Sequence, residues 1–298
     1  MSFWPFPRGT QSYVRLATPH DRVPVSELVA RTGKRHGSAA LEDQAALLMG
    51  GLSTVAFVGG DACGFLGVHL REPAGEPPQV WADVALAAID GEPRLNSVVP
   101  QLVTGAIPGL IRLEATGMVC LAPDGWLYEG LRRAGFVEED RVITYALTFA
   151  PPHDDAGEPA SPLIRAATTA DTAAVIEINR EAFGPFWQYD DAMVLHWMLT
   201  SDHAVVVQAE GHGAGFAITA AGQQGHYAHL IRIATDLRDR GRGFGRMLVE
   251  DALRYAAGSR APGLALNTQA SNVVSRNLYE SLGFRQTGHS LAVMIYRL

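Results

Sequence analysis

Residues 229–257 read HLIRIATDLRDRGRGFGRMLVEDALRYAA, and this stretch decides the fold class. The segment HLIRIAT (229–235) is an apolar run of strand length, and a turn rich in glycine and arginine follows it. Apolar side chains then recur at helical spacing, namely Phe244, Met247, Leu248, Ala252 and Tyr255. Gly258 is a typical helix stop. A strand, a glycine turn and a helix in this order predict an α/β layered domain.

The glycine turn has the composition of a loop that binds phosphate. Its residues are Arg240, Gly241, Arg242, Gly243, Phe244, Gly245 and Arg246. The glycines allow the backbone to approach a ligand, and the first N–H groups of the following helix are unpaired and partly positive. The arginines add formal charge. A glycine turn without a ligand is the structural alternative.

Three other readings of the turn fit less well. The spacing G-x-G-x-G does not match the dinucleotide motif G-x-G-x-x-G, and no G-K-[ST] sequence of a P-loop is present. An arginine–glycine RNA-binding tract would be repeated and disordered, whereas this tract is single and lies between a strand and a helix. The turn therefore favours a phosphate-bearing ligand of another kind.

A second element follows the strand LALNTQ (264–269) and reads SNVVSRNLYESLGF (271–284). Ser271 or Asn272 is expected to cap a helix that Gly283 ends. Helical geometry places an amide, a hydroxyl, a guanidinium and a phenol on one face, from Asn272, Ser275, Arg276 and Tyr279. A half-buried packing role is the alternative for the tyrosine.

Together the two elements resemble the GNAT acetyltransferase superfamily. The motif [QR]-x-x-G-x-[GA] is met by RGRGFG (240–245). The signature N-x-x-[AS]-x-x-[LY]-Y-x-x-x-G-F is met by Asn272, Ser275, Leu278, Tyr279, Gly283 and Phe284. The resemblance implies acetyl-CoA as co-substrate, with its pyrophosphate on the backbone of 241–246. It places the pantetheine along Ile233, Ala234 and Thr235, with Asn272 near it and Tyr279 near the sulfur.

The chain also repeats itself once. Segment 13–21 reads YVRLATPHD and segment 163–171 reads LIRAATTAD, while LRRAGF (131–136) corresponds to YESLGF (279–284). We therefore expect one copy at 13–149, a proline-rich linker at 150–162 and a second copy at 163–298. The resemblance implies two tandem GNAT-like domains, each a mixed and mostly antiparallel sheet flanked by helices, in a layout similar to that of mycothiol synthase.

The first copy lacks the chemistry of the second. Its loop region, 88–102, has no G-x-G, and Pro93 and Pro100 are expected to interrupt the loop and the helix. Leu131 stands where the second copy has Tyr279. We expect a degenerate scaffold domain that shapes the acceptor cleft by packing as an intrachain pseudo-dimer.

The implied reaction is direct attack of a neutral amine on a thioester. Tyr279 is the expected acid, since a phenol at the sulfur can protonate the leaving thiolate. Main-chain N–H groups near 233–235 would stabilise the oxyanion. His229 stands where many family members carry a glutamate base, with His226 as the second candidate and a packing role as the alternative. Asn267 replaces a different family glutamate and cannot act as a base.

The acceptor is expected to be a small-molecule or peptide amine that contacts FGPFWQYDD (183–191). Asp190 and Asp191 either attract its cationic amine or lie in water. A non-catalytic module that binds acyl-CoA, and a nucleotide- or RNA-binding protein, are the competing functions. The enzymatic interpretation fails if the main-chain amides of the turn are already occupied by the protein's own groups, or if no trough leads from them toward the phenol.

Composition sets the outer limits. The chain has 298 residues, 47% of them hydrophobic, with 24 basic and 31 acidic side chains and a formal net charge of −7, which disfavours nucleic acid as a partner. No run reaches the roughly 20 apolar residues of a membrane span, and the N-terminus does not read as a secretory signal, so a cytoplasmic protein is expected. Cys63 and Cys120 lack metal-ligand spacing, so no metal site is expected. A monomer or a homodimer is compatible with the sequence.

Overall fold

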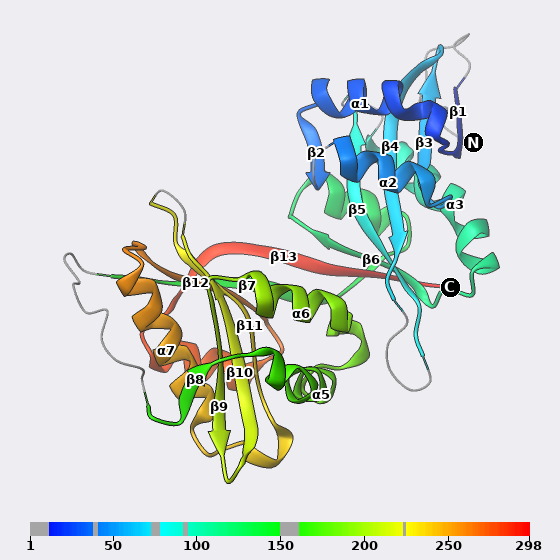
Figure 1. Cartoon of the computed structure of the whole chain (residues 1–298). Helices are drawn as coiled ribbons and strands as arrows, with labels where there is room; N and C mark the ends of the chain where they lie inside the picture. Colours follow the sequence, from blue (N-terminus) through cyan, green and yellow to red (C-terminus); the bar gives the residue numbers. More distant parts are fainter. Residues whose placement is uncertain (1–11, 38–40, 73–77, 92–94, 150–160, 223–224) are drawn as a thin grey trace. The chain divides into compact units, whose positions relative to one another are not determined.

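The computed structural model describes residues 12–37, 41–72, 78–91, 95–149, 161–222 and 225–298 (Figure 1). These residues form two compact units. The N-terminal unit comprises the described part of Met1–Val142 together with Ser290–Leu298, and the C-terminal unit comprises Ile143–His289. Most of the expected linker at 150–162, and Pro93, lie outside the described residues.

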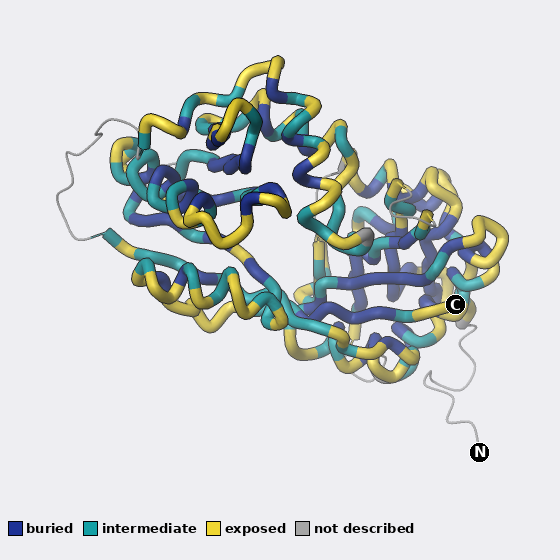
Figure 2. Tube along the Cα trace, turned by 90° about the horizontal axis from the view of Figure 1, so that it is seen from below, coloured by how far each residue is buried: buried dark blue, intermediate teal, exposed yellow. Residues whose placement is uncertain are grey.

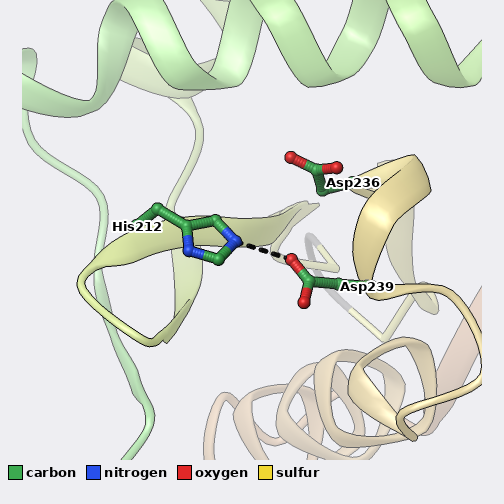
Figure 3. Close-up of side chains that lie close together, drawn as sticks. All are labelled: His212, Asp236 and Asp239. Atoms are coloured by element: carbon green, nitrogen blue, oxygen red, sulfur yellow. Dashed lines mark hydrogen bonds and ion pairs between the residues drawn. The ribbon is translucent and has the colours of Figure 1, made fainter.

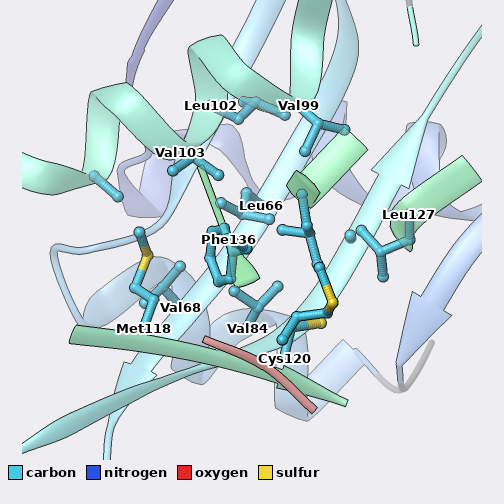
Figure 4. Packing of buried hydrophobic residues seen from close by; sticks show 14 of the residues in the cluster. Leu66, Val68, Val84, Val99, Leu102, Val103, Met118, Cys120, Leu127 and Phe136 are labelled. Carbon is cyan, nitrogen blue, oxygen red and sulfur yellow. The ribbon is translucent and has the colours of Figure 1, made fainter. Parts of the chain in front are cut away.

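The N-terminal unit is a mixed sheet between two layers of helices. Its elements are β1 (Ser12–Leu16), η1 (Pro19–Asp21), α1 (Arg22–Arg31), β2 (Lys34–Gly37), α2 (Leu41–Met49), β3 (Thr54–Val58), β4 (Asp61–Leu70), β5 (Trp81–Ile89), α3 (Leu95–Arg112), β6 (Gly117–Ala122) and α4 (Trp126–Arg133). The strand order is β1-β3-β4-β5-β6-β13, and β2 pairs with β5. One core cluster packs α3 and α4 on the sheet (Figure 4), and another packs α1 and α2.

The C-terminal unit repeats this plan. Its elements are β8 (Ile164–Ala166), η2 (Thr169–Asp171), α5 (Thr172–Ala182), η3 (Pro185–Trp187), α6 (Asp191–Thr200), β9 (His203–Ala209), β10 (His212–Ala220), β11 (Ala228–Thr235), η4 (Leu237–Asp239), α7 (Phe244–Gly258), β12 (Gly263–Gln269) and α8 (Val273–Ser281). The strand order is β7-β12-β11-β10-β9-β8. Helices α7 and α8 contribute to one core cluster, and α5 and α6 contribute to another. Figure 2 shows that buried residues concentrate along the strands within each unit.

Two long strands belong partly to each unit. In β7 (Val137–Thr148), the residues from Ile143 onward belong to the C-terminal unit, although they come from the first repeat. In β13 (Arg285–Arg297), the residues from Ser290 onward belong to the N-terminal unit, where Ala292 to Arg297 pair with β6. The units therefore exchange strand segments, and they do not separate at the linker as 13–149 and 163–298 would.

The structure bears out the repeat in detail. Arg15 forms a bidentate ion pair with Asp21, and the Asp21 carboxylate also accepts from Thr18 N–H at 2.8 Å. Arg165, Asp171 and Thr168 form the same arrangement in the second copy. The parallel ladders also correspond, with Trp81–Asp83 on Gly117–Val119 in one unit and Ala228–Leu230 on Leu264–Leu266 in the other.

One local expectation is wrong. Pro100 does not interrupt the helix, because α3 runs through both Pro100 and Pro108. The apolar face of α3 is buried in the core, with Val98, Val99, Leu102, Val103, Ala106 and Leu110 each at most 1% exposed. This packing outweighs the loss of the backbone hydrogen bonds that proline cannot donate. None of the described helices has both the length and the apolar character needed to cross a membrane.

Candidate active site

Strands β11 and β12 separate along their length. They pair in parallel only at Ala228–Leu230 and Leu264–Leu266, although β11 continues to Thr235 and β12 to Gln269. Toward β10, β11 stays paired up to Thr235, with a bulge that leaves Ile231 without an opposite residue. The far edge of β11 after the bulge is therefore not covered by any strand in the described part of the chain.

The outer edge of β11 presents main-chain amides. Asp236 N–H donates to Ala214 O of β10 at 3.0 Å. Because N–H direction alternates along a strand, the N–H group of Ala234 also points toward β10. The N–H groups of Ile233 and Thr235 point the other way, toward the gap. These amides can pair with an extended ligand that lies alongside β11, as the sequence predicts for a pantetheine.

The glycine turn leads into α7 through two left-handed residues. Gly241 has φ +80° and Gly243, the N-cap residue of α7, has φ +87°, a conformation that side chains rarely adopt. The first helical hydrogen bond of α7 is donated by the amide of Met247 to Gly243 O. No described group accepts a hydrogen bond from the amides of Gly241, Gly243, Phe244, Gly245 or Arg246. The Arg242 amide reaches Asp239 O at 3.4 Å. The turn thus offers an unoccupied row of donors at the positive end of a helix.

The three arginines of the turn differ in their partners. Arg242 is paired with Asp239 at 2.6 Å and with Glu210 at 2.8 Å, so its charge is largely neutralised within the protein. Arg246 donates to Ser281 Oγ at 2.7 Å. Arg240 is exposed and has no partner among the described residues. Of the three, Arg240 is the side chain best placed to meet an added anion.

A buried group of charges supports the turn. His212 Nε2 lies 2.7 Å from Asp239 Oδ2, and Asp236 lies beside this pair (Figure 3). The Asp236 carboxylate accepts from the main chain and the guanidinium of Arg238, which lowers the pKa of Asp236 to about 2. Both aspartates are therefore paired with an arginine, and the group fixes the course of the chain from β11 into the glycine turn.

Helix α8 carries the second predicted set. Asn272 is its N-cap residue, and Asn272 Oδ1 accepts from Ser275 N–H at 3.2 Å. Tyr279 is 4% exposed and packs near Tyr145 and Phe284. Burial raises the pKa of Tyr279 to about 12, against the opposing effect of the Ser275 hydroxyl. The phenol therefore keeps its proton at neutral pH and can serve as an acid.

His229 lies on the opposite face of the sheet from Tyr279. Its neighbours Ala228 and Leu230 join the core cluster that contains α7 and Tyr279, so alternation turns His229 toward α5 and α6. Burial lowers the pKa of His229, and no described residue forms a hydrogen bond with its imidazole. A neutral imidazole is the form that can accept a proton. The alternative candidate, His226, is exposed ahead of β11.

The acids of the segment 183–191 are used within the fold. Asp190 caps α6 by accepting from Met193 N–H at 2.7 Å, and Asp191 is paired with Arg180. The rings of Phe183 and Tyr189 instead lie against the guanidinium of Arg232 of β11, a residue that the sequence did not single out. An arginine inside the apolar run HLIRIAT was the available signal, because arginine is rarely buried without a partner.

In the N-terminal unit the corresponding features are filled. Leu127 and Leu131, which correspond to Ser275 and Tyr279, are fully buried in the core cluster shown in Figure 4. Gly130 packs so closely on α3 that an added Cβ would lie 2.7 Å from Val99. Strand β2 pairs with Leu86–Ile89 of β5, along the edge that β6 leaves after Asp83.

Part of the sequence matches known proteins. Residues 172–284 match the Acetyltransferase (GNAT) family. N-acetylaspartate synthetase of Homo sapiens is 33% identical over 85 residues, which are 28% of this chain and 28% of that protein. Mycothiol acetyltransferase of Acidothermus cellulolyticus is 35% identical over 83 residues, 27% of this chain and 25% of that protein. The chain therefore matches little more than a quarter of the length of these relatives.

A solved structure extends the likeness to the whole chain. The tandem GNAT protein from the clavulanic acid biosynthesis pathway covers 96% of this chain and 98% of its own, with a TM-score of 0.60 and 17% identity. This likeness concerns the fold. Residues 172–284 thus match the GNAT acetyltransferase family, and the chain as a whole has the fold of a tandem GNAT protein.

Proposed function

We propose that this protein is an acetyl-CoA-dependent N-acetyltransferase whose C-terminal unit transfers the acetyl group to a primary amine. The observation that carries the proposal is the set of amides of Gly241 and of Gly243 to Arg246, which donate to no described group, together with the gap between β11 and β12. Backbone donors at a helix N-terminus suit a pyrophosphate, and the amides of Ile233 and Thr235 suit an extended pantetheine. The family match supports acetyl transfer as the chemistry.

The proposed reaction needs one base and one acid. The neutral amine attacks the thioester carbon, the new C–N bond forms and the C–S bond breaks. The amine loses its proton to His229, and the departing thiolate takes a proton from Tyr279. The two side chains belong to opposite faces of the sheet, so both can reach one thioester only where the strands separate. The gap beyond Leu230 and Leu266 meets this requirement.

The relatives bear on the acceptor only through their names. N-acetylaspartate synthetase is named for an N-acetylated amino acid, and mycothiol acetyltransferase is named for a different acceptor. The first of these names supports an amine acceptor for this chain. We propose a small-molecule or peptide amine.

The test combines binding and turnover in the full-length protein. Acetyl-CoA binding is measured by calorimetry, and thiol release is measured with a panel of amines. Tyr279→Phe is expected to lower kcat by about 100-fold or more, the usual range for a lost general acid, while the Kd for acetyl-CoA changes little. Binding without turnover of any amine would favour a non-catalytic acyl-CoA module, and failure to bind acetyl-CoA would refute the proposal.

A further inference from the structure

We propose that Arg232 binds a carboxylate of the acceptor, so that the acceptor is an amine that also carries a carboxylate, as amino acids do. This inference rests on the proposed function and narrows its substrate class. It starts from the environment of one buried side chain.

Arg232 is a buried cation without a counter-charge. It is 8% exposed and lies on β11, with its guanidinium carbon 3.3 Å from the centre of the Phe183 ring and 4.9 Å from that of Tyr189. No carboxylate of the described residues forms an ion pair with it. Burial lowers the pKa of Arg232 to about 10, so the group stays charged at neutral pH. A buried charge left in this state is costly to the fold, which indicates a use for it.

The hydrogen bonds around Arg232 are also incomplete. Its Nε donates to Asn179 Oδ1 at 3.0 Å, and one terminal nitrogen, Nη2, donates to Trp187 O at 3.1 Å. Both acceptors are neutral, and Nη1 has no acceptor in the described structure. Asn179 Nδ2, on the same amide, is buried without a partner. The site therefore has an excess of donors and positive charge, which one carboxylate would satisfy.

The acids that could have neutralised Arg232 have other roles. Asp190 caps α6, and Asp191 is paired with Arg180 on the exposed side of α5. Asp190 and Asp191, which were expected to attract a cationic amine, are thus engaged elsewhere, and the segment packs against a cation of β11 instead. This arrangement favours an acceptor with a negative group at this end.

The position of Arg232 relates it to the reacting groups. The bulge at Ile231 places Ile231 and Arg232 on the same face of β11, toward α5, which is also the face of His229. Arg232 is next in the chain to Ile233, whose amide faces the gap. In an amino acid the amine and the carboxylate share one carbon. A carboxylate held by Arg232 would therefore keep the amine close to both the proposed base and the thioester.

A purely structural role is the competing explanation. In that case Arg232 would only hold the segment from Phe183 to Tyr189 on the sheet through its ring contacts. Such a role predicts no difference between acceptors with and without a carboxylate, so substrate preference separates the two explanations.

The experiment compares proteinogenic amino acids with their carboxamides in the full-length protein. Rates are expressed as kcat/KM per neutral amine, because the carboxamide lowers the pKa of the amine. We expect the free acids to be preferred by at least about tenfold, the value of one charge-assisted hydrogen-bond pair. Equal rates, or a preference for the carboxamides, would overturn the inference.

Variants assign the preference to Arg232. Asn179→Asp supplies the missing counter-charge with nearly the same shape, so the preference should fall to about parity while the thermal unfolding temperature is kept. Arg232→Gln should also abolish it. Arg180→Gln removes an exposed arginine of the same helix layer and should leave the preference unchanged. An unaltered preference in Asn179→Asp would contradict the assignment.

A binding arm keeps this inference separate from the proposed function. Calorimetry with acetyl-CoA alone tests the function. Titration of a dicarboxylic amino acid into the CoA-saturated protein tests the carboxylate site, and Asn179→Asp should weaken that binding about tenfold or more. Normal acetyl-CoA binding with no amino-acid binding would refute the carboxylate site and leave the acyltransferase proposal standing.

Discussion

Gly37 of β2 lies opposite Leu86 of β5, on the edge of β5 that is left uncovered where β6 diverges after Asp83. The pairing continues from Gly37 to Lys34, which lies opposite Ile89. After its own bulge, β11 has no such covering strand among the described residues. Within the N-terminal unit, β2 therefore covers the edge of β5 that corresponds to the edge of β11 at which an extended ligand is proposed to bind.

This difference predicts that one chain binds one acetyl-CoA. Residues Leu86 to Ile89 of β5 are paired with β2 on one side and with β4 on the other, so a pantetheine would have to displace β2. Calorimetric titration should give a stoichiometry of one per chain. A stoichiometry of two would show that β2 is displaced and that the N-terminal unit is not degenerate in binding.

Gly243→Ala is predicted to weaken acetyl-CoA binding about fivefold to thirtyfold. An alanine with a φ of +87° is strained by about 1–2 kcal/mol. The loop relieves this strain by leaving the conformation that aligns its amides, so binding must restore the strained conformation. Gly60→Ala is the matched control, because Gly60 has φ +95° and equally open surroundings but lies in the turn between β3 and β4. Gly60→Ala should lower the free energy of unfolding by a similar amount and leave the affinity for acetyl-CoA unchanged. A loss of affinity in both variants would argue against a role of the glycine turn in binding.

The pH dependence of kcat is predicted to have an acidic limb and no alkaline limb from Tyr279. Burial lowers the pKa of His229 below its usual value, so the base becomes protonated at a lower pH than an ordinary histidine does. Burial raises the pKa of Tyr279 to about 12, so the acid stays protonated throughout an ordinary assay range. His229→Gln should remove the acidic limb and lower kcat by about 100-fold. Persistence of that limb in the variant would exclude His229 as the base.

Local patterns in the sequence were enough to predict the turn, the caps and the order of the elements. Helix α7 ends at Gly258, and Asn272 caps α8, because capping depends on residues within one turn of the helix end. The duplication could also be predicted from the sequence, because each copy keeps the arginine, threonine and aspartate of its first turn.

Pairings between distant segments could not be predicted in this way. Arg242 was expected to carry free charge, but its partner Glu210 comes from the turn between β9 and β10. Arg232 has no charge partner among the described residues, a property that only the packed structure reveals. The exchange of strand segments could not be predicted either, because the sequence of β7 does not indicate which unit its second half joins.

The repeated first-turn aspartates are predicted to stabilise the fold until the pH falls below about 4. The guanidinium of Arg165 lowers the pKa of Asp171 to about 2, and Arg15 lowers that of Asp21. A lowered carboxylate pKa contributes stability above the unfolded value, and this contribution is lost as the pH falls toward the folded value. Asp21→Asn and Asp171→Asn should each reduce the free energy of unfolding at pH 7 by about 1–3 kcal/mol and flatten its acid dependence.

Denaturant unfolding at several pH values checks this prediction. Asp43→Asn is the control, because Asp43 is exposed on α2 and forms no ion pair with the described residues. Its replacement should change the free energy of unfolding by less than about 0.5 kcal/mol. If the two repeat variants unfolded with an unchanged pH dependence, the ion pairs would not be the source of the acid sensitivity.

The exchange of strand segments predicts that residues 163–298 alone do not form a stable acetyltransferase. Such a fragment lacks Tyr145, which is fully buried in the C-terminal unit, and whose hydroxyl lies 2.8 Å from Glu280 Oε1. It also exposes the apolar residues that Ser290–Leu298 buries in the N-terminal unit. In the full chain, Tyr145→Ala should cost about 3 kcal/mol or more and lower activity, although it lies in the first repeat. Tyr13→Ala, at a half-exposed tyrosine of β1, should leave activity unchanged. A folded, fully active 163–298 fragment would show that the exchanged segment is dispensable.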